Sequence, residues 1–334
     1  MTEAEPLGAE RVLVVGAGSL GSVYGGFLAR GGADVQLLAR QPHARAVQEA
    51  GGLVLETGGE TVIAPLRAEW RPELVGPADV VIVLTKTPDT EQSLAGLGHL
   101  RDGVRLAVSL QNGVEKDAAV ARWCGEEPVV GGVSMVGGTL VAPGFVRHTF
   151  RGPTIVGELA GGTSPRVERF AALLEGAGLE AVVASDVRSA EWTKLVHAVP
   201  TMGLTALARL PFHTVLLSPE LARAYVVLAR ESARVAEAAG AVLDDETVMF
   251  PIRTIASAPE AEAIALVQAQ GRRLERGGMT DVRVSMLQSI ERGRRTEVEA
   301  IFGSLVREAR RQGIPVPTVE FCYGLLSGID GTLA

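Results

Sequence analysis

The chain has 334 residues, of which 47% are hydrophobic and 21% charged, and its formal net charge is −7 at pH 7. A chain of this size and composition buries a large core and is typical of a globular protein with two domains. The negative charge argues against nucleic acid as a partner, because neutralising phosphates requires a clustered basic surface. The two cysteines, Cys124 and Cys322, have no metal-ligand or disulfide-framework spacing, so we expect no metal site.

Targeting and membrane signals are missing from the sequence pattern. Residues 1–10 are acidic and hold no apolar stretch of the signal-peptide kind, and no window holds eighteen uninterrupted apolar residues. We therefore expect a cytoplasmic protein with no membrane partner.

The first predicted elements are a strand, a glycine turn and a helix. The apolar run Arg11–Val15 leads into Gly-Ala-Gly-Ser-Leu-Gly, and a helix-compatible stretch follows over 22–30. This context is typical of a dinucleotide-binding turn, in which the first glycine permits the turn, the second leaves room for a pyrophosphate and the third lets helix and strand approach closely. The helix N-terminus offers N–H groups to the phosphates. A plain strand-to-helix connection is the alternative. The expected cofactor-binding residues here are Gly16, Gly18, Ser19, Leu20 and Gly21.

The end of the second predicted strand, 34–40, indicates which dinucleotide binds. An NAD-selective protein usually places Asp or Glu there for the ribose hydroxyls, whereas this chain has Arg40. A guanidinium suits a 2′-phosphate through bidentate, charge-assisted hydrogen bonds. The sequence therefore favours NADP(H) over NAD(H), unless Arg40 is only a solvated charge at a strand end.

The first half of the chain alternates short apolar runs with helix-like patterns, which predicts a parallel sheet covered on both faces. Two late runs, 144–148 and 154–157, suggest a hairpin because Gly152-Pro153 lies between them. The other expected strands are 53–55, 64–66, 80–84, 105–110 and 129–134.

The pattern becomes helical after Asp186. We predict an α/β protein with a nucleotide-binding domain over 1–186 and a mostly helical domain over 187–334. A long apolar helix pair in the second domain is compatible with core packing or with a homodimer interface. The Ala-rich stretches that predict long helices are 221–239, 260–270 and 298–312.

Polar residues follow two of the predicted strands at their carboxyl ends, where ligands bind in open α/β folds. Lys86 follows the strand 80–84 and could contact phosphate or a substrate carboxylate, or it is an ordinary solvated lysine. Asn112 follows the strand that ends at Leu110 and would face the same crevice. Turn chemistry is the alternative for Asn112, since Asn-Gly favours positive φ.

The second domain offers three further candidates. Lys194 lies among aliphatic residues near the start of its first helix. Desolvation lowers the pKa of a lysine, so such a group could deliver the proton that a carbonyl reduction needs opposite the hydride. The alternative is a lysine whose stem packs on the core. Ser285 offers a hydroxyl and Glu297 a carboxylate, although Glu297 also suits a helix start.

Six ordered segments, which together cover nearly the whole chain, resemble the ketopantoate reductase family. Its members are NADPH-dependent enzymes that reduce 2-dehydropantoate to pantoate on the route to coenzyme A. The segments are Gly16–Ser22 with Arg40; Val83–Lys86; Leu110–Glu115; Pro143–His148; Trp192–Leu195 with Leu204–Leu207; and Ser285–Gln288 with Thr296 and Glu297.

The resemblance implies a Rossmann domain that binds NADP(H), followed by a helical substrate domain similar to the C-terminal domain of 6-phosphogluconate dehydrogenase, with the active site in the cleft between them. It implies that Lys194 is the general acid at the ketone oxygen and that Glu297 supports it. Asn112 and Ser285 would hold a small 2-oxo acid substrate. The cofactor contacts that it implies outside the glycine turn are Arg40, Lys86, Asn112 and Glu297.

The match breaks on the helix that carries the lysine. The family has asparagines four and eight residues after it, on one helix face toward the substrate, whereas this chain has Ala198 and Met202. Each lost amide contact removes about 1 to 3 kcal/mol of recognition, which is enough to change the preferred substrate. Pro200 should bend this helix, and Gly203 stands where the family usually has proline.

Three hypotheses for the function stay open. The first is reduction of 2-dehydropantoate, and the second is a family offshoot that reduces another 2-oxo acid, carbonyl or imine with an apolar group beside Met202. The third is a non-catalytic NADP(H) sensor, against which Lys194 and Glu297 argue. His197 or Thr201 could fill the space of the missing asparagines, or His197 is a satisfied helix histidine.

Overall fold

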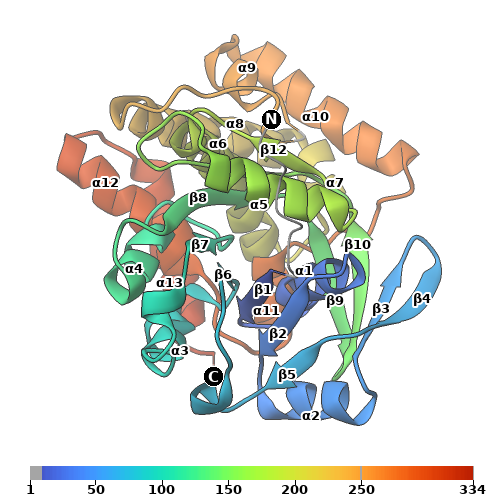
Figure 1. The fold of residues 1–334 in the computed structure, drawn as a ribbon. Helices are drawn as coiled ribbons and strands as arrows, with labels where there is room; N and C mark the ends of the chain where they lie inside the picture. The colour runs from blue at the N-terminus through green and yellow to red at the C-terminus, as the bar shows by residue number, and fades with distance from the viewer. Residues whose placement is uncertain (1–9, 249, 334) are drawn as a thin grey trace. The chain divides into compact units, whose positions relative to one another are not determined.

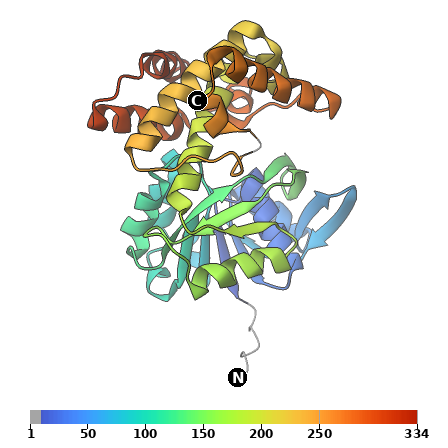
Figure 2. The ribbon, with the colours of Figure 1, turned by 90° about the horizontal axis from the view of Figure 1, so that it is seen from above.

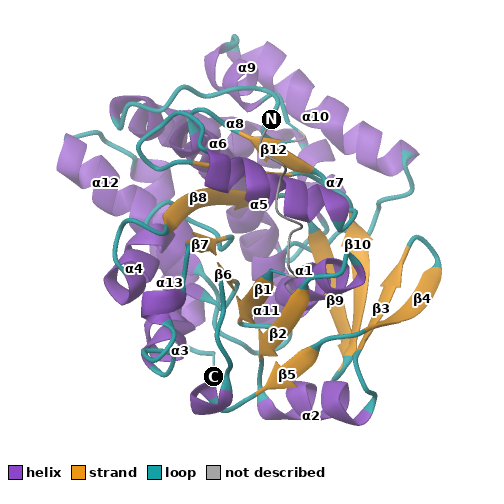
Figure 3. Cartoon of the chain, viewed as in Figure 1, coloured by secondary structure: helices purple, strands orange, loops and turns teal. Residues whose placement is uncertain are grey.

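The computed structural model describes residues 10–248 and 250–333. The chain divides into two compact units, whose course is shown in Figure 1. The first holds the chain up to Gln111 together with Lys116–Val187, and the second holds Asn112–Glu115 together with Arg188–Ala334. Within the described residues every strand belongs to the first unit (Figure 3).

An eight-stranded sheet forms the centre of the first unit. All its strand pairs are parallel except β11 with β8, which are antiparallel. The predicted parallel sheet is therefore confirmed. In spatial order its strands are β12 (Ala181–Val183), β11 (Thr154–Gly157), β8 (Val129–Ser134), β7 (Leu106–Ser109), β6 (Val80–Val83), β1 (Arg11–Val15), β2 (Asp34–Leu38) and β5 (Arg67–Glu69).

Helices cover both faces of this sheet because successive side chains of a strand point to opposite faces. Val12 and Val14 of β1 share a core with α1 and α5, while Leu13 and Val15 share a second core with α3 and α4. The helices of this unit are α1 (Ser19–Arg30), α2 (Gln41–Glu49), α3 (Thr90–Ala95), α4 (Lys116–Cys124) and α5 (Pro165–Gly176), with 3₁₀ turns at Pro72–Leu74, Thr87–Asp89 and Arg101–Gly103.

A second, four-stranded sheet was not expected from the sequence. In spatial order its strands are β4 (Glu60–Ala64), β3 (Leu53–Thr57), β10 (Phe145–Phe150) and β9 (Gly137–Ala142). The predicted strand 64–66 is wrong, because β4 ends at Ala64 and β5 begins only at Arg67. Pro65 lies between them and cannot donate a ladder hydrogen bond.

The predicted hairpin between 144–148 and 154–157 is also wrong. The strand β10 pairs with β3 and β9, whereas β11 pairs with β8 and β12. Both edges of each strand are thus occupied by other partners. The intervening residues 151–153 carry the chain from one sheet to the other, and there the Met135 N–H donates to the Pro153 carbonyl at 2.9 Å.

The second unit is helical (Figure 2). The stretch predicted as one helix over 298–312 is divided into a π-helical turn, Glu299–Gly303, and α12. No helix in residues 10–248 and 250–333 combines the length and the apolar character needed to cross a bilayer. The helices are α6 (Val187–Ala208), α7 (Phe212–Leu217), α8 (Pro219–Ala238), α9 (Ile252–Ser257), α10 (Glu260–Arg276), α11 (Ser285–Glu291), α12 (Ser304–Gln312) and α13 (Pro317–Asp330).

Candidate active site

The glycine turn of the first unit is tight on two sides and open on the third. Gly16 has a φ of +89°, and a Cβ added to it would lie 2.3 Å from the backbone N of Thr85. A Cβ on Gly21 would lie 2.5 Å from the Gly16 carbonyl oxygen. At Gly18, by contrast, no atom lies within 4 Å of an added Cβ. This open side at the N-terminus of α1 fits the phosphates of a dinucleotide.

A buried histidine supports the start of α1, and no sequence pattern indicated its role. His43 of α2 accepts a hydrogen bond at Nδ1 from the Gly144 N–H (2.9 Å), so its Nε2 carries the proton and donates to Ser22 Oγ at 3.0 Å. Burial lowers the pKa of His43. The neutral ring therefore links the β9–β10 turn to the helix that begins at the glycine turn.

The two cationic candidates of the first unit lie just beyond strand ends. Arg40 is the residue before α2, its side chain is 81% exposed, and its Nη2 is 4.0 Å from Asp89 Oδ2. Lys86 follows β6 and immediately precedes the 3₁₀ turn Thr87–Asp89. The exposed Arg40 guanidinium is accessible to an anion, with Asp89 as its competing partner.

A buried polar network holds the ends of β6 and β7. Gln111 Nε2 donates to the Thr85 carbonyl and to Thr90 Oγ1, each at 2.7 Å, and Ser109 Oγ donates to Gln111 Oε1 at 2.9 Å. These bonds join Thr85, the residue before Lys86, to Gln111, the residue before Asn112. They therefore fix the backbone position from which each of the two candidate residues extends.

In the second unit, α6 carries the lysine and the two substituted positions. This helix is continuous from Val187 to Ala208 through Pro200. Spacings of four and eight residues place Lys194, Ala198 and Met202 near one helix face. Ala198 is buried, whereas Lys194 and Met202 are partly buried. Ser285, the first residue of α11, lies beside this face, with Oγ 3.9 Å from Met202 Sδ.

The loop Asn112–Glu115 meets the segment that leads into the π-helical turn. Asn112 Nδ2 donates to Glu297 Oε2 at 3.3 Å, although the two residues are 185 positions apart. A Cβ on Gly113, whose φ is +93°, would lie 2.4 Å from the Ala300 carbonyl oxygen. The structure thus brings two of the predicted site residues into contact.

The π-helical turn also contacts α6. A Cβ on Gly203 would lie 2.5 Å from the ring of Phe302, so the missing side chain lets the turn approach the helix closely. Any larger residue at position 203 would have to displace that ring.

His197 of α6 belongs to a buried cluster of hydroxyls and aromatic rings. Its Nδ1 is 2.8 Å from the Tyr225 hydroxyl, which is 3.2 Å from Thr201 Oγ1, and its ring lies 4.6 Å from that of Phe250. Burial, together with the positive charge of Lys194, lowers the pKa of His197 to about 3. His197 and Thr201 thus bind Tyr225, which agrees with the interpretation of His197 as a satisfied helix histidine.

Comparison with known proteins identifies the family. The family model described as "Ketopantoate reductase PanE/ApbA" matches residues 12–161, and the model of its C-terminal part matches residues 186–330. The chain belongs to the ketopantoate reductase family. The resemblance read from the sequence is confirmed, and with it an oxidoreductase that acts on a ketone.

Two relatives and one solved structure with the same fold illustrate what this chain is similar to. The 2-dehydropantoate 2-reductase of Halobacterium salinarum is 32% identical over 93% of this chain and 95% of its own. The crystal structure of a PanE/ApbA family ketopantoate reductase from Ralstonia eutropha has a TM-score of 0.81 at 30% identity, covering 96% of this chain and 98% of its own. The ternary structure of D-mandelate dehydrogenase with NADH and anilino(oxo)acetate has a TM-score of 0.83 at 22% identity and 96% and 98% coverage, which shows a shared fold.

Proposed function

We propose that this ketopantoate reductase family member reduces 2-dehydropantoate to pantoate with NADPH. The contact between Asn112 and Glu297 carries the proposal, because it unites two residues of widely separated family segments at one place. The similarity to curated 2-dehydropantoate 2-reductases over almost the full chain supports the same substrate. We further propose that residues 1–186 form the cofactor domain and residues 187–334 the substrate domain.

The proposed chemistry needs a proton donor beside the ketone. A bound nicotinamide supplies the hydride to C2. Negative charge then grows on the carbonyl oxygen, and the Lys194 ammonium neutralises it by hydrogen bonding and proton donation. The Glu297 carboxylate favours the protonated form of the lysine, and the amide of Asn112 and the hydroxyl of Ser285 orient the substrate.

Most of the assigned cofactor contacts belong to the first unit. The open side of the turn at Gly18 and the N-terminus of α1 would hold the pyrophosphate, with Ser19, Leu20, Lys86, Asn112 and Glu297 as further contacts. The guanidinium of Arg40 would bind the 2′-phosphate that distinguishes NADPH from NADH.

A second candidate function follows from the apolar surface of α6. Ala198 and Met202 cannot replace amide hydrogen bonds, and Met202 presents its sulfur to Ser285 Oγ. This surface favours a 2-oxo acid, another carbonyl compound or an imine with an apolar group in place of the polar end of 2-dehydropantoate.

Initial rates of NADPH oxidation with 2-dehydropantoate and a panel of 2-oxo acids test the proposal. We expect 2-dehydropantoate to be turned over. Its complete inactivity alongside turnover of a more apolar 2-oxo acid would establish the second candidate instead. If the protein binds NADPH but reduces no carbonyl compound, the result would support the third hypothesis, a non-catalytic NADP(H) sensor.

Arg40→Asp should reverse the cofactor preference. Losing one charge-assisted pair and adding a repulsive carboxylate should lower the ratio of kcat/KM with NADPH to kcat/KM with NADH by about ten- to a hundredfold. Asp89→Asn is the matched control, since it removes the carboxylate 4.0 Å from Arg40 and should maintain or raise that ratio. An unchanged ratio in Arg40→Asp would refute the assignment of the 2′-phosphate to this residue.

A further inference from the structure

The loop Asn112–Glu115 belongs structurally to the second unit although the chain on both sides of it belongs to the first. Such a short segment needs contacts of its own to be held there. Two have been described: the amide of Asn112 on Glu297, and the backbone of Gly113 against Ala300. The third is an ion pair at the end of the loop.

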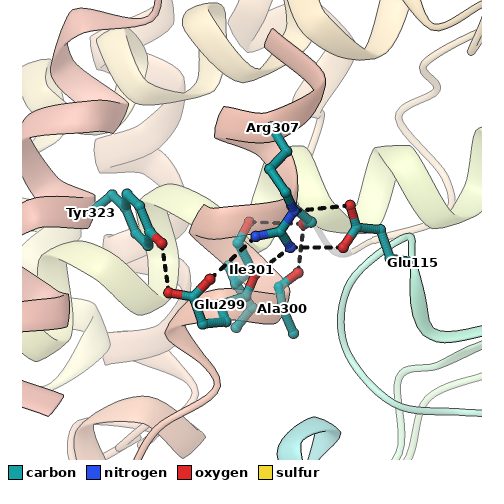
Figure 4. A network of polar contacts seen from close by, with 7 residues as sticks. Glu115, Glu299, Ala300, Ile301, Arg307 and Tyr323 are labelled. Carbon is teal, nitrogen blue, oxygen red and sulfur yellow. Dashed lines mark hydrogen bonds and ion pairs between the residues drawn. The ribbon is translucent and has the colours of Figure 1, made fainter. Parts of the chain in front are cut away.

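Arg307 of α12 forms that ion pair with a fork of two parallel hydrogen bonds to Glu115 (Figure 4). The distances are 3.2 Å from Nε to Oε1 and 2.7 Å from Nη2 to Oε2. Bidentate geometry fixes the orientation of the carboxylate as well as its distance. The guanidinium therefore determines where the loop ends relative to α12.

The same guanidinium holds the π-helical turn. Its Nη1 donates to Glu299 Oε2 at 3.2 Å, and the Tyr323 hydroxyl donates to the other oxygen of that carboxylate at 2.5 Å (Figure 4). A Cβ on Gly303 would lie 2.5 Å from Glu299 Oε2, so a larger residue there would have to displace this carboxylate. Glu299 lies only two residues after Glu297, so holding Glu299 also restricts the position of Glu297. The π-helical form of this turn is itself frequent at functional sites.

We propose that Arg307 is a positioning residue that clamps the loop Asn112–Glu115 to the segment 297–303 and thereby sets the place of the Asn112 amide beside Glu297. The inference rests on the proposed function, in which that amide binds the 2-oxo acid. Arg307, Glu115 and Glu299 have side chains that are 50 to 58% exposed. Ion pairs this exposed add little to folding stability, so their removal should displace the loop without unfolding the protein.

Arg307→Ala tests the clamp. We expect KM for the accepted 2-oxo acid to rise about five- to tenfold, with kcat changed less than twofold, because a misplaced amide weakens substrate binding. Arg311→Ala is the matched control: Arg311 lies on the same helix and pairs with Glu308. Arg307→Lys should recover part of the loss, since it restores the charge without the fork. Glu115→Ala should match Arg307→Ala, and the double variant should be no worse than either.

Hydrogen exchange provides a readout that does not depend on turnover. Amides of residues 112–115 should exchange faster in Arg307→Ala than in the unsubstituted protein, and not in Arg311→Ala. If no 2-oxo acid is reduced, the proposed function fails. The hydrogen-exchange rates of residues 112–115 then test by themselves whether Arg307 holds the loop. Unchanged exchange over 112–115 overturns the inference, as does a KM equal to that of Arg311→Ala in an active enzyme.

Discussion

Replacing Lys194 by alanine should lower kcat with the accepted 2-oxo acid by about a hundred- to ten-thousandfold, the range over which a positioned proton donor contributes. Without the ammonium, charge that develops on the carbonyl oxygen has neither its counter-charge nor its proton. The Kd of NADPH should change little, because the assigned cofactor contacts are other residues. Single-turnover rates together with cofactor titration would measure both quantities.

Two further variants separate the charge of Lys194 from its packing. Lys194→Met keeps an apolar stem of similar length on the partly buried face of α6 but has no proton to give, so it should be as inactive as the alanine variant. Arg223→Ala removes an exposed cation from the same unit and should retain full activity. Turnover by Lys194→Met at the rate of the unsubstituted enzyme would exclude Lys194 as the general acid.

Installing asparagines at positions 198 and 202 should raise kcat/KM for 2-dehydropantoate by about a hundredfold or more. Two amide contacts at about 1 to 3 kcal/mol each supply that gain, and the i, i+4 spacing on a continuous α6 places both on the face of Lys194. Activity with apolar 2-oxo acids should fall in parallel. Steady-state kinetics with both substrate classes would report the exchange of specificity.

Two control variants separate the effect of the added amides from the effects of side-chain size and of burial at positions 198 and 202. Met202→Leu changes the side chain without adding an amide and should leave the substrate order as it is. Because Ala198 is buried, Met202→Asn alone is the variant with the smaller risk to folding, and it should give part of the gain. If neither the single nor the double variant improves 2-dehydropantoate turnover, these positions do not determine specificity.

Local features of the fold were predictable because the residues that cause them are adjacent in sequence. The turn at Gly16 is set by its own φ and by the neighbouring strand end, and the sequence pattern contains both. The strand β10, in contrast, was assigned the wrong partner. Its neighbour β3 comes about ninety residues earlier, and a turn signal such as Gly152-Pro153 does not reveal which sheet edge receives the next strand.

The candidate site was predictable where family segments carry its residues, as with Asn112 and Glu297. The clamp was not, because an arginine on an amphipathic helix such as α12 has the pattern of any solvated surface charge. Its significance depends on Glu115, which lies 192 positions away along the chain. Contacts between residues that far apart in the chain form only when the second unit folds, and they produce no periodic pattern in the local sequence.

The neutral imidazole of His197 limits how pH–rate profiles of this enzyme can be interpreted. With its pKa lowered to about 3, this ring keeps the same charge throughout the pH range in which kinetics are usually measured. A rise or fall in kcat centred near pH 6 to 7 would resemble an ordinary histidine titration and yet must originate elsewhere. The histidine three residues from Lys194 is thus a fixed dipole beside the lysine, and no second cation forms there until the pH approaches 3.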